Sequence, residues 1–231
     1  MTMARHPLTL LTREVAPFAL NPASVCLLLQ DLHAPFADPD EGWMAARARQ
    51  KVLSREFDEY FDTLRLIAPN IAALVRAFRS WSIPVMYSCL GRETGAEPSR
   101  FQRATGMDWR LDGPDGRFPP AWQPMSDEPV FSRPGWGALS SHSLLRYLRD
   151  AEIDSVVVIG TMFDFGIRQT CVELADHGFG SLIVSDAVCA LTASGYAHTA
   201  GNIAHGLTKL RSTAELLDLM AGLAEHGSVV I

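Results

Sequence analysis

The chain alternates short, continuously apolar runs with longer stretches in which apolar residues recur every three or four positions. Continuous apolar runs are typical of strands buried on both faces of a parallel sheet, and the wider spacing is typical of helices with one buried face. We expect strands at 25–30, 84–90, 130–131, 155–159, 181–185 and 209–212, and helices at 43–67, 69–78, 143–150, 164–177, 196–207 and 213–224. The alternation predicts an α/β domain whose mainly parallel sheet is covered by helices on both faces.

Prolines and glycines set the expected boundaries. Residues 1–22 contain Pro7, Pro17 and Pro22 and are expected to form an irregular arm. Pro69 is expected to begin a helix of its own, because proline fits the first helical turn. The segment 91–128 is rich in Gly, Pro and Asp. A connection of that length within a compact domain is usually functional or lies at an interface.

Composition narrows the function classes. The 231 residues are expected to form a single domain, 1–231. A net charge of −6 gives no basic surface for a nucleic acid or an anionic membrane. No apolar run approaches the roughly 18 residues of a membrane span, and residues 1–19 show no signal-peptide pattern, so we expect a cytoplasmic protein.

The four cysteines are widely spaced and contain no CxxC pair. This spacing does not suit a zinc site. We expect buried free thiols in a reducing compartment. Cys171 is expected more than one turn inside a helix, which is a poor position for a nucleophile.

Three segments hold polar or turn residues where strands end. Asp31 follows the strand 25–30, Arg133 follows the short strand 130–131, and Gly160 begins a turn into a helix after the strand 155–159. In a parallel sheet such positions share the carboxyl edge, where ligands bind. The free backbone N–H groups at the start of the following helix favour negative charge there.

Together these segments resemble the isochorismatase-like hydrolase superfamily, the cysteine hydrolases that include nicotinamidases, ureidoacrylate and biuret amidohydrolases, and isochorismatases. The resemblance runs from about Val25 to Leu219. It implies a three-layer, Rossmann-type α/β/α fold with a six-stranded, mainly parallel sheet, and an Asp–Lys–Cys catalytic triad. The segments that carry it are Leu28–Phe36, Ser132–Leu139, Gly160–Thr170, Asp176–Phe179 and Ser185–Ala190.

Only one member of the implied triad is kept. The family's aspartate falls on Asp31. Its lysine falls on Arg133, because 133–139 looks like Lys-Pro-Gly-x-Gly-Ala-Phe, and its cysteine falls on Gly166, because 160–166 looks like Gly-Val-Thr-Thr-Asp-Val-Cys. Without a thiolate the family's thioester route should fail. Arginine keeps the positive charge but is a poor proton shuttle.

The family also contains members without the thiol. True isochorismatases carry glycine at this position and hydrolyse a vinyl ether, but they keep the lysine. They also carry Tyr-Ala-His where this chain has Met162, Phe163 and Asp164. Isochorismate is therefore not the expected substrate.

Two hypotheses remain open. In the first, the chain hydrolyses a small molecule without cysteine, with Asp31 as acid or base, Arg133 holding an anion, and the backbone of 161–166 as a cradle. In the second, it is an inactive family member that serves as a structural or regulatory subunit, for instance beside an active paralogue. The resemblance implies a homodimer or homotetramer, and segments 43–67 and 91–128 are the candidate contact surfaces.

Several further residues are candidates for the site. His33 is expected either on the surface or in the site. Asp31, His33, Asp38 and Asp40 partly match the metal cluster of some nicotinamidases, but the downstream histidine is missing, so neither a metal nor a cofactor is expected. The expected substrate-binding residues are Phe36, Trp136, Thr161, Met162, Phe163 and Asp164.

Overall fold

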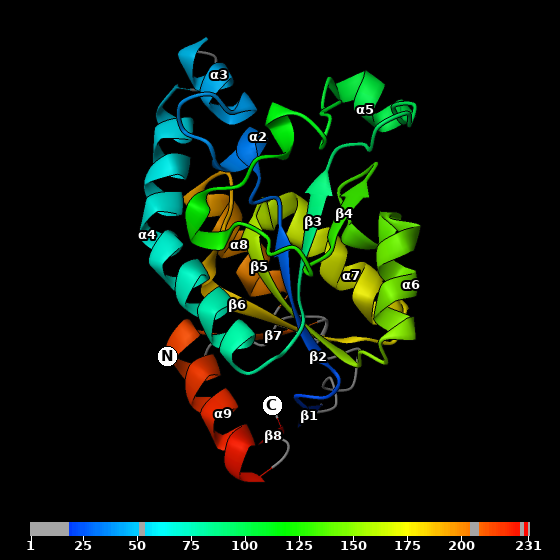
Figure 1. Cartoon of the computed structure of the whole chain (residues 1–231). Coiled ribbons are helices and arrows are strands. Elements are labelled where there is room, and N and C mark those ends of the chain that lie inside the picture. Colours follow the sequence, from blue (N-terminus) through cyan, green and yellow to red (C-terminus); the bar gives the residue numbers. More distant parts are fainter. Residues whose placement is uncertain (1–18, 51–53, 204–207, 227–228, 231) are drawn as a thin grey trace.

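Six parallel strands form the centre of the protein in a computed structural model that describes residues 19–50, 54–203, 208–226 and 229–230 (Figure 1). Their order is β4-β3-β2-β5-β6-β7, which confirms the expected fold class. β2 and β5 lie at the middle, and every residue of both is buried. The strands are β2 (Val25–Gln30), β3 (Val85–Leu90), β4 (Val130–Arg133), β5 (Ser155–Thr161), β6 (Gly180–Cys189) and β7 (Lys209–Arg211).

Helices cover both faces of this sheet, as Figure 1 shows. One face packs against α4 (Ser54–Ser80) and α9 (Thr213–His226), and the other against α6 (His142–Asp150), α7 (Arg168–Asp176) and α8 (Ala193–Ile203). Successive residues of a strand point to opposite faces. Leu27 and Leu29 accordingly belong to the α4 side of the core, and Cys26 and Leu28 to the other side.

The connection between β3 and β4 is the long segment singled out in the sequence. It contains α5 (Arg100–Thr105) and two short 3-10 turns, η1 (Pro114–Gly116) and η2 (Pro120–Trp122). Trp122 fixes it to the core by donating its Nε1–H to the backbone oxygen of Leu32 at 3.0 Å. Its far end is held by Glu128, which pairs with Arg79 of α4 at 2.7 Å.

Two sequence predictions about helices are wrong. Pro69 does not begin a helix but lies inside α4. The buried face of α4 continues in register past it, from Leu64 and Ile67 to Ile71, so burial of that face outweighs the backbone hydrogen bond that proline removes. The expected helix 43–67 is divided: α3 (Trp43–Arg49) ends before residues 51–53, which lie outside the described residues.

Other boundaries also differ from expectation. The end of the expected arm is not irregular, because β1 (Ala19–Leu20) pairs antiparallel with β8 (Val229–Val230); residues 1–18 lie outside the described residues. The expected strand 181–185 continues to Cys189 as part of β6. The predicted helix 164–177 begins as a π-helical turn, η4 (Phe163–Ile167). The last four residues of the expected helix 196–207 are outside the described part.

The remaining short elements are α2 (Ala34–Ala37), directly after the Asp31 segment, and η3 (Ala138–Ser140), directly after β4. Among the described residues, no helix combines the length and apolar character that a bilayer crossing requires.

Gly160 of β5 lies against the backbone of Gln30 in β2, with no room for a side chain. Its φ of +134° is unfavourable for residues with a side chain, and a Cβ there would lie 2.0 Å from the backbone oxygen of Gln30. We expect Gly160→Ala to lower the free energy of unfolding by about 3 kcal/mol, measured by urea denaturation. Gly201 of α8 is the matched control, because a Cβ there meets no atom within 4 Å. Gly201→Ala should raise stability by about 0.5–1 kcal/mol, and an equal effect of both changes would contradict this account.

Candidate functional site

Asp31 stands at the carboxyl end of β2, in a conformation that few non-glycine residues adopt. Its φ is +54°, which turns the chain sharply out of the strand. Its side chain is completely buried. The backbone N–H of Leu90 in β3 donates to Oδ1 at 3.0 Å, so the carboxylate faces across the sheet edge toward β3 and β4.

The guanidinium of Arg133, at the end of β4, binds this carboxylate with both terminal nitrogens. Nη1 donates to Oδ1 of Asp31 at 3.0 Å, and Nη2 donates to Oδ2. Nη1 also donates to the backbone oxygen of Ser88 at 3.1 Å, and Nε donates to that of Trp136 at 3.2 Å. These bonds use four of the five guanidinium N–H groups. Both partners of the ion pair are 0% exposed, so the pair is sealed from solvent.

The turn after β5 places Gly166 beside the carboxylate of Asp31. Met162 has a left-handed conformation, with φ +57°, and leads into η4. A Cβ built on Gly166 would lie 3.4 Å from Oδ2 of Asp31. The hydroxyl of Thr161 fixes the turn to β2 by donating to the backbone oxygen of Asp31 at 2.6 Å. Asp31, Arg133 and Gly166 therefore meet at one point of the carboxyl edge.

Gln30 is the functional-site residue that sequence reasoning missed. Its carboxamide occupies the space beside Gly166: a Cβ on Gly166 would be 2.6 Å from Nε2 of Gln30. Nε2 donates to the backbone oxygen of Trp136 at 3.2 Å, and Oε1 accepts from the hydroxyl of Thr170 at 2.7 Å. The sequence did offer a signal: Gln30 is an amide at the end of an otherwise apolar, buried strand. A buried amide needs hydrogen-bond partners at both ends, so polar groups are expected to meet there.

Trp136, an expected substrate-binding residue, contacts this centre through its backbone oxygen, which accepts from Gln30 and Arg133. Its ring lies between those of Phe101 in α5 and Phe165 in η4, with centroids 5.5 Å and 5.6 Å away. Phe165 is 47% exposed. Through these ring contacts Trp136 links α5 of the long insert to the turn after β5.

The other expected substrate-binding residues are mostly core residues. Phe36 is completely buried and packs edge-on against Trp109 at 5.2 Å. Phe163 is also completely buried, and its ring contacts that of Tyr196. Thr161 and Met162 are buried as well. Full burial favours a structural role for these side chains in this conformation.

Asp164 is only half-buried and ties η4 to the loop after β6. Its Oδ1 accepts from the backbone N–H of Leu191 at 3.2 Å. Burial raises the pKa of Asp164 above its usual value, against the hydrogen bond from Leu191, which lowers it. Asp164 therefore holds the loop at Leu191, and no side-chain hydrogen bond caps the start of η4.

His33 lies in the interior rather than on the surface. Its Nε2 lies 3.1 Å from the backbone oxygen of Leu90, while Nδ1 has no hydrogen-bond partner among the described residues. Burial lowers the pKa of His33 to about 4, although Asp31 acts in the opposite direction. The ring is surrounded by those of Phe36, Trp109 and Phe118.

The four cysteines are placed as core residues. All four are free and buried, as the sequence predicts. Burial raises the pKa of Cys171 and Cys189 to about 12, and raises those of Cys26 and Cys89 further. A thiol in such surroundings stays protonated and unreactive.

The described residues also contain no group of three His, Cys, Asp or Glu side chains placed to share a metal ion. Asp38, one of the residues considered for a metal, instead accepts the backbone N–H groups of Asp40 and Glu41, both at 2.9 Å.

Removing one partner of the buried pair should be costly. We expect Asp31→Asn to lower the free energy of unfolding by about 3–5 kcal/mol, because it leaves the Arg133 guanidinium buried without a counter-charge. The double variant Asp31→Asn/Arg133→Gln should recover part of that loss in urea denaturation. Glu41→Gln, in the exposed pair with Arg117, is the control and should change stability little. A negligible effect of Asp31→Asn would contradict the buried clamp.

His33 should make stability depend on pH. A histidine in the unfolded chain titrates near pH 6.5 and His33 in the folded chain near 4. The uncharged, buried ring contributes fully to the free energy of unfolding above about pH 6.5. This contribution is lost as pH falls toward 4, by up to about 3 kcal/mol. Urea denaturation near pH 7 and near pH 4.5 measures the loss. His33→Gln should remove much of it, while His142→Gln, at an exposed position, should retain it. The same pH profile in both variants would refute the assignment.

Comparison with known proteins identifies the relationship. Residues 28–215 match the family model of the isochorismatase domain. An uncharacterized isochorismatase family protein of Bacillus subtilis (strain 168), YwoC, is 23% identical over 155 residues, which is 66% of this chain and 82% of that relative.

Solved structures share the fold at lower identity. A cysteine hydrolase from Pseudomonas syringae pv. phaseolicola 1448A has a TM-score of 0.72 at 18% identity, covering 90% of this chain and 97% of that one. The nicotinamidase/pyrazinamidase PncA from Bacillus subtilis has a TM-score of 0.64 at 15% identity, covering 82% and 100%. Since the family model spans most of the chain, the protein belongs to the isochorismatase family, within the superfamily of isochorismatase-like hydrolases.

Proposed function

We propose that this protein is a non-catalytic member of the isochorismatase family, in which the former reaction centre has become a buried structural clamp. The proposal rests on one observation: the Asp31–Arg133 pair is sealed, and the Gln30 carboxamide fills the space beside Gly166. In this role the chain serves as a structural or regulatory subunit, either in a homo-oligomer or beside a paralogous subunit.

The chemistry of the site supports this role. The family's route needs a thiolate to form a covalent intermediate. Gly166 stands where the resemblance places that thiol, and the four cysteines are buried with raised pKa values. A guanidinium does not release a proton in a protein, so Arg133 is a poor substitute for lysine in proton transfer.

The geometry of Asp31 supports it further. A general acid or base must come within hydrogen-bond reach of its substrate. Both carboxylate oxygens of Asp31 are bound by Arg133, and Oδ1 also accepts from Leu90. A substrate would reach Asp31 only after displacing Arg133 or Gln30, each of which is itself held by backbone oxygen atoms.

A subunit role also requires contact surfaces. Leu66, in α4, is 78% exposed and belongs to the segment 43–67 considered above; Phe165, in the turn after β5, is 47% exposed. Exposed large apolar side chains of this kind are candidates for contacts between subunits.

Hydrolysis without cysteine is the second candidate. The left-handed conformations of Asp31 and Met162, together with the π-helical turn η4, favour it, because such backbone features concentrate at functional sites. Here Asp31 would be the acid or base toward a small-molecule substrate, Arg133 would hold an anion, and the backbone of 161–166 would form the cradle. Trp136, Phe165 and Asp164 would be the partly exposed side chains that contact such a substrate.

Restoring a thiol tests whether Gln30 closes the former centre. A Cβ at Gly166 collides with Gln30, so a new thiol requires a shorter residue at position 30. We expect Gly166→Cys/Gln30→Ala/Arg133→Lys to react with 4-nitrophenyl acetate in a burst of about one equivalent, with an acetyl adduct on the introduced thiol. Gly166→Cys/Arg133→Lys, which keeps Gln30, is the matched control and should give a much smaller burst. Equal bursts would show that Gln30 does not close the centre.

Turnover assays of the wild-type protein distinguish the two candidate functions. We expect no turnover across a panel of small amides and esters. Turnover that is lost in Asp31→Asn, with an unchanged circular dichroism spectrum at the assay temperature, would overturn the proposal and favour the second candidate.

A further inference from the structure

His33 is the residue at which the long insert meets the core. Its ring is completely buried and is enclosed by aromatic rings from both sides of that boundary. On the core side, the ring centroid of Phe36 in α2 is 5.7 Å away. On the insert side, those of Trp109 and Phe118 are 6.4 Å and 6.2 Å away. The insert therefore packs on His33 at two separate points of its chain.

The hydrogen bonds of this ring suit only its uncharged form. Nε2 lies 3.1 Å from the backbone oxygen of Leu90, which can only accept, so Nε2 carries the hydrogen. Nδ1 is then the unprotonated nitrogen, and it has no hydrogen-bond partner among the described residues. A proton added at Nδ1 would place a positive charge and a new donor inside the aromatic enclosure, where no acceptor receives it.

The charged groups around His33 are already paired. Asp31 raises the pKa of His33 and Arg133 lowers it, and the two bind each other. Burial outweighs both and lowers that pKa to about 4. The ionisable side chains next to the enclosing residues are bound elsewhere or uncharged: Asp38 accepts from the backbone of Asp40 and Glu41, Asp108 pairs with Arg92, Arg110 with Asp112 and Arg117 with Glu41, and burial raises the pKa values of Tyr87 and Cys89.

Residues 107–118, which carry both insert rings, form a flap between two fixed parts of the insert. On one side, the Ser99 hydroxyl before α5 donates to the backbone oxygen of Pro134 at 2.9 Å. On the other, Trp122 of η2 donates to the backbone oxygen of Leu32. Several side chains of the flap itself are exposed, among them Arg110, Asp112, Pro114 and Arg117.

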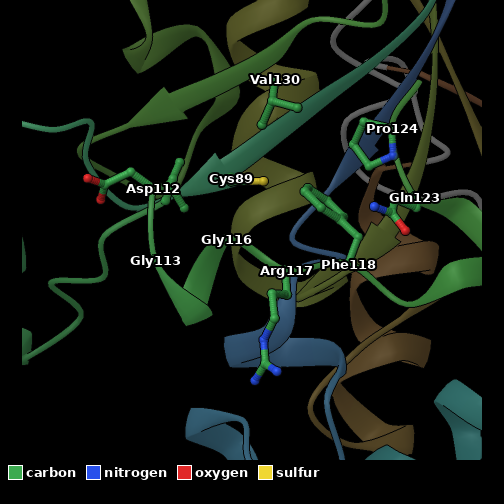
Figure 2. A pocket seen from close by; sticks show the side chains of 10 residues that line it. Cys89, Asp112, Gly113, Gly116, Arg117, Phe118, Gln123, Pro124 and Val130 are labelled. Carbon is green, nitrogen blue, oxygen red and sulfur yellow. The ribbon is translucent and has the colours of Figure 1, made fainter. Parts of the chain in front are cut away.

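The flap is not packed tightly against the neighbouring strands. A hollow of about 540 Å³ lies between the insert and β3, lined by Cys89 and Val130 and by insert residues from 111 to 124. Figure 2 shows the Phe118 ring directed toward Cys89, while the Arg117 side chain extends away from it. Segments with few buried contacts open at a lower free energy than core strands do. The ring contacts at His33 are therefore a main attachment of the flap.

We propose that protonation of His33 opens this flap. When Nδ1 takes up a proton from solvent, residues 107–118 move off the ring, water binds the new N–H group, and the end of β3 beside Asp31 becomes accessible. A solvated histidine titrates near pH 6.5 and the enclosed ring near 4. The open state therefore binds the proton more tightly, and acid favours opening. This inference does not depend on the proposed loss of catalysis.

Hydrogen exchange of the full chain, followed by mass spectrometry near pH 7 and near pH 4.5 and corrected for the intrinsic effect of pH, measures the opening. We expect the amides of 107–118 to be less protected than those of β5 at both pH values, because the flap opens without global unfolding. The protection of the flap should fall about 60-fold between the two pH values, as titration near 4 when closed and near 6.5 when open requires.

Variants assign the effect to His33. His33→Gln keeps a donor toward Leu90 but cannot titrate, so its flap protection should change less than about threefold between the two pH values. His142→Gln, at an exposed position, is the matched control and should keep the full fall. Phe118→Leu removes one wall of the enclosure and should lower flap protection already near pH 7, with little change in β5, even if His33→Gln does not fold.

Two results would overturn the proposal. One is equal protection of the flap and β5 at both pH values, which would mean that the flap opens only when the whole chain unfolds. The other is the same acid-induced loss of flap protection in the wild-type protein and in His33→Gln.

Discussion

The ion pair between Asp31 and Arg133 is the interaction on which the carboxyl edge of the sheet depends. Two charges that are both 0% exposed are tolerated only where each is neutralised and hydrogen-bonded. Asp31 accepts hydrogen bonds from Leu90 of β3 and from Arg133 of β4. Arg133 is neutralised by Asp31 and also donates to the backbone oxygen atoms of Ser88 and Trp136. The pair therefore joins the ends of β2, β3 and β4 and fixes the turn that follows β4.

Beside this pair the interior is filled by protein groups. A thiol at the turn after β5 would face Asp31, but Gly166 leaves space there, and the Gln30 carboxamide fills it. That amide is hydrogen-bonded at both ends, by Trp136 and Thr170. It therefore holds the end of β2 against the turn after β4 and against α7. Asp31 and Met162 have left-handed backbone conformations and form the sharp turns on either side of this amide.

The long insert between β3 and β4 has two structural roles. Through Phe101 it packs on Trp136. Through Phe118 it packs on His33 and Tyr87. The ring of His33 stays uncharged because burial lowers its pKa.

The sequence by itself determined the order of strands and helices, the parallel sheet, the burial of the thiols and the convergence of Asp31, Arg133 and Gly166. The elements and the buried thiols follow from local patterns, and Asp31, Arg133 and the turn after Gly160 share one edge because they follow parallel strands. Gly166 itself was indicated by the resemblance to the family. Tertiary structure alone decided that the ion pair is sealed, that Gln30 occupies the space beside Gly166, and that Pro69 lies within α4. Each of these depends on groups distant in sequence, such as Gln30 and Thr170, which are 140 residues apart. A periodic pattern identifies which face of an element is buried, but which partner meets it there is decided only when the chain has packed.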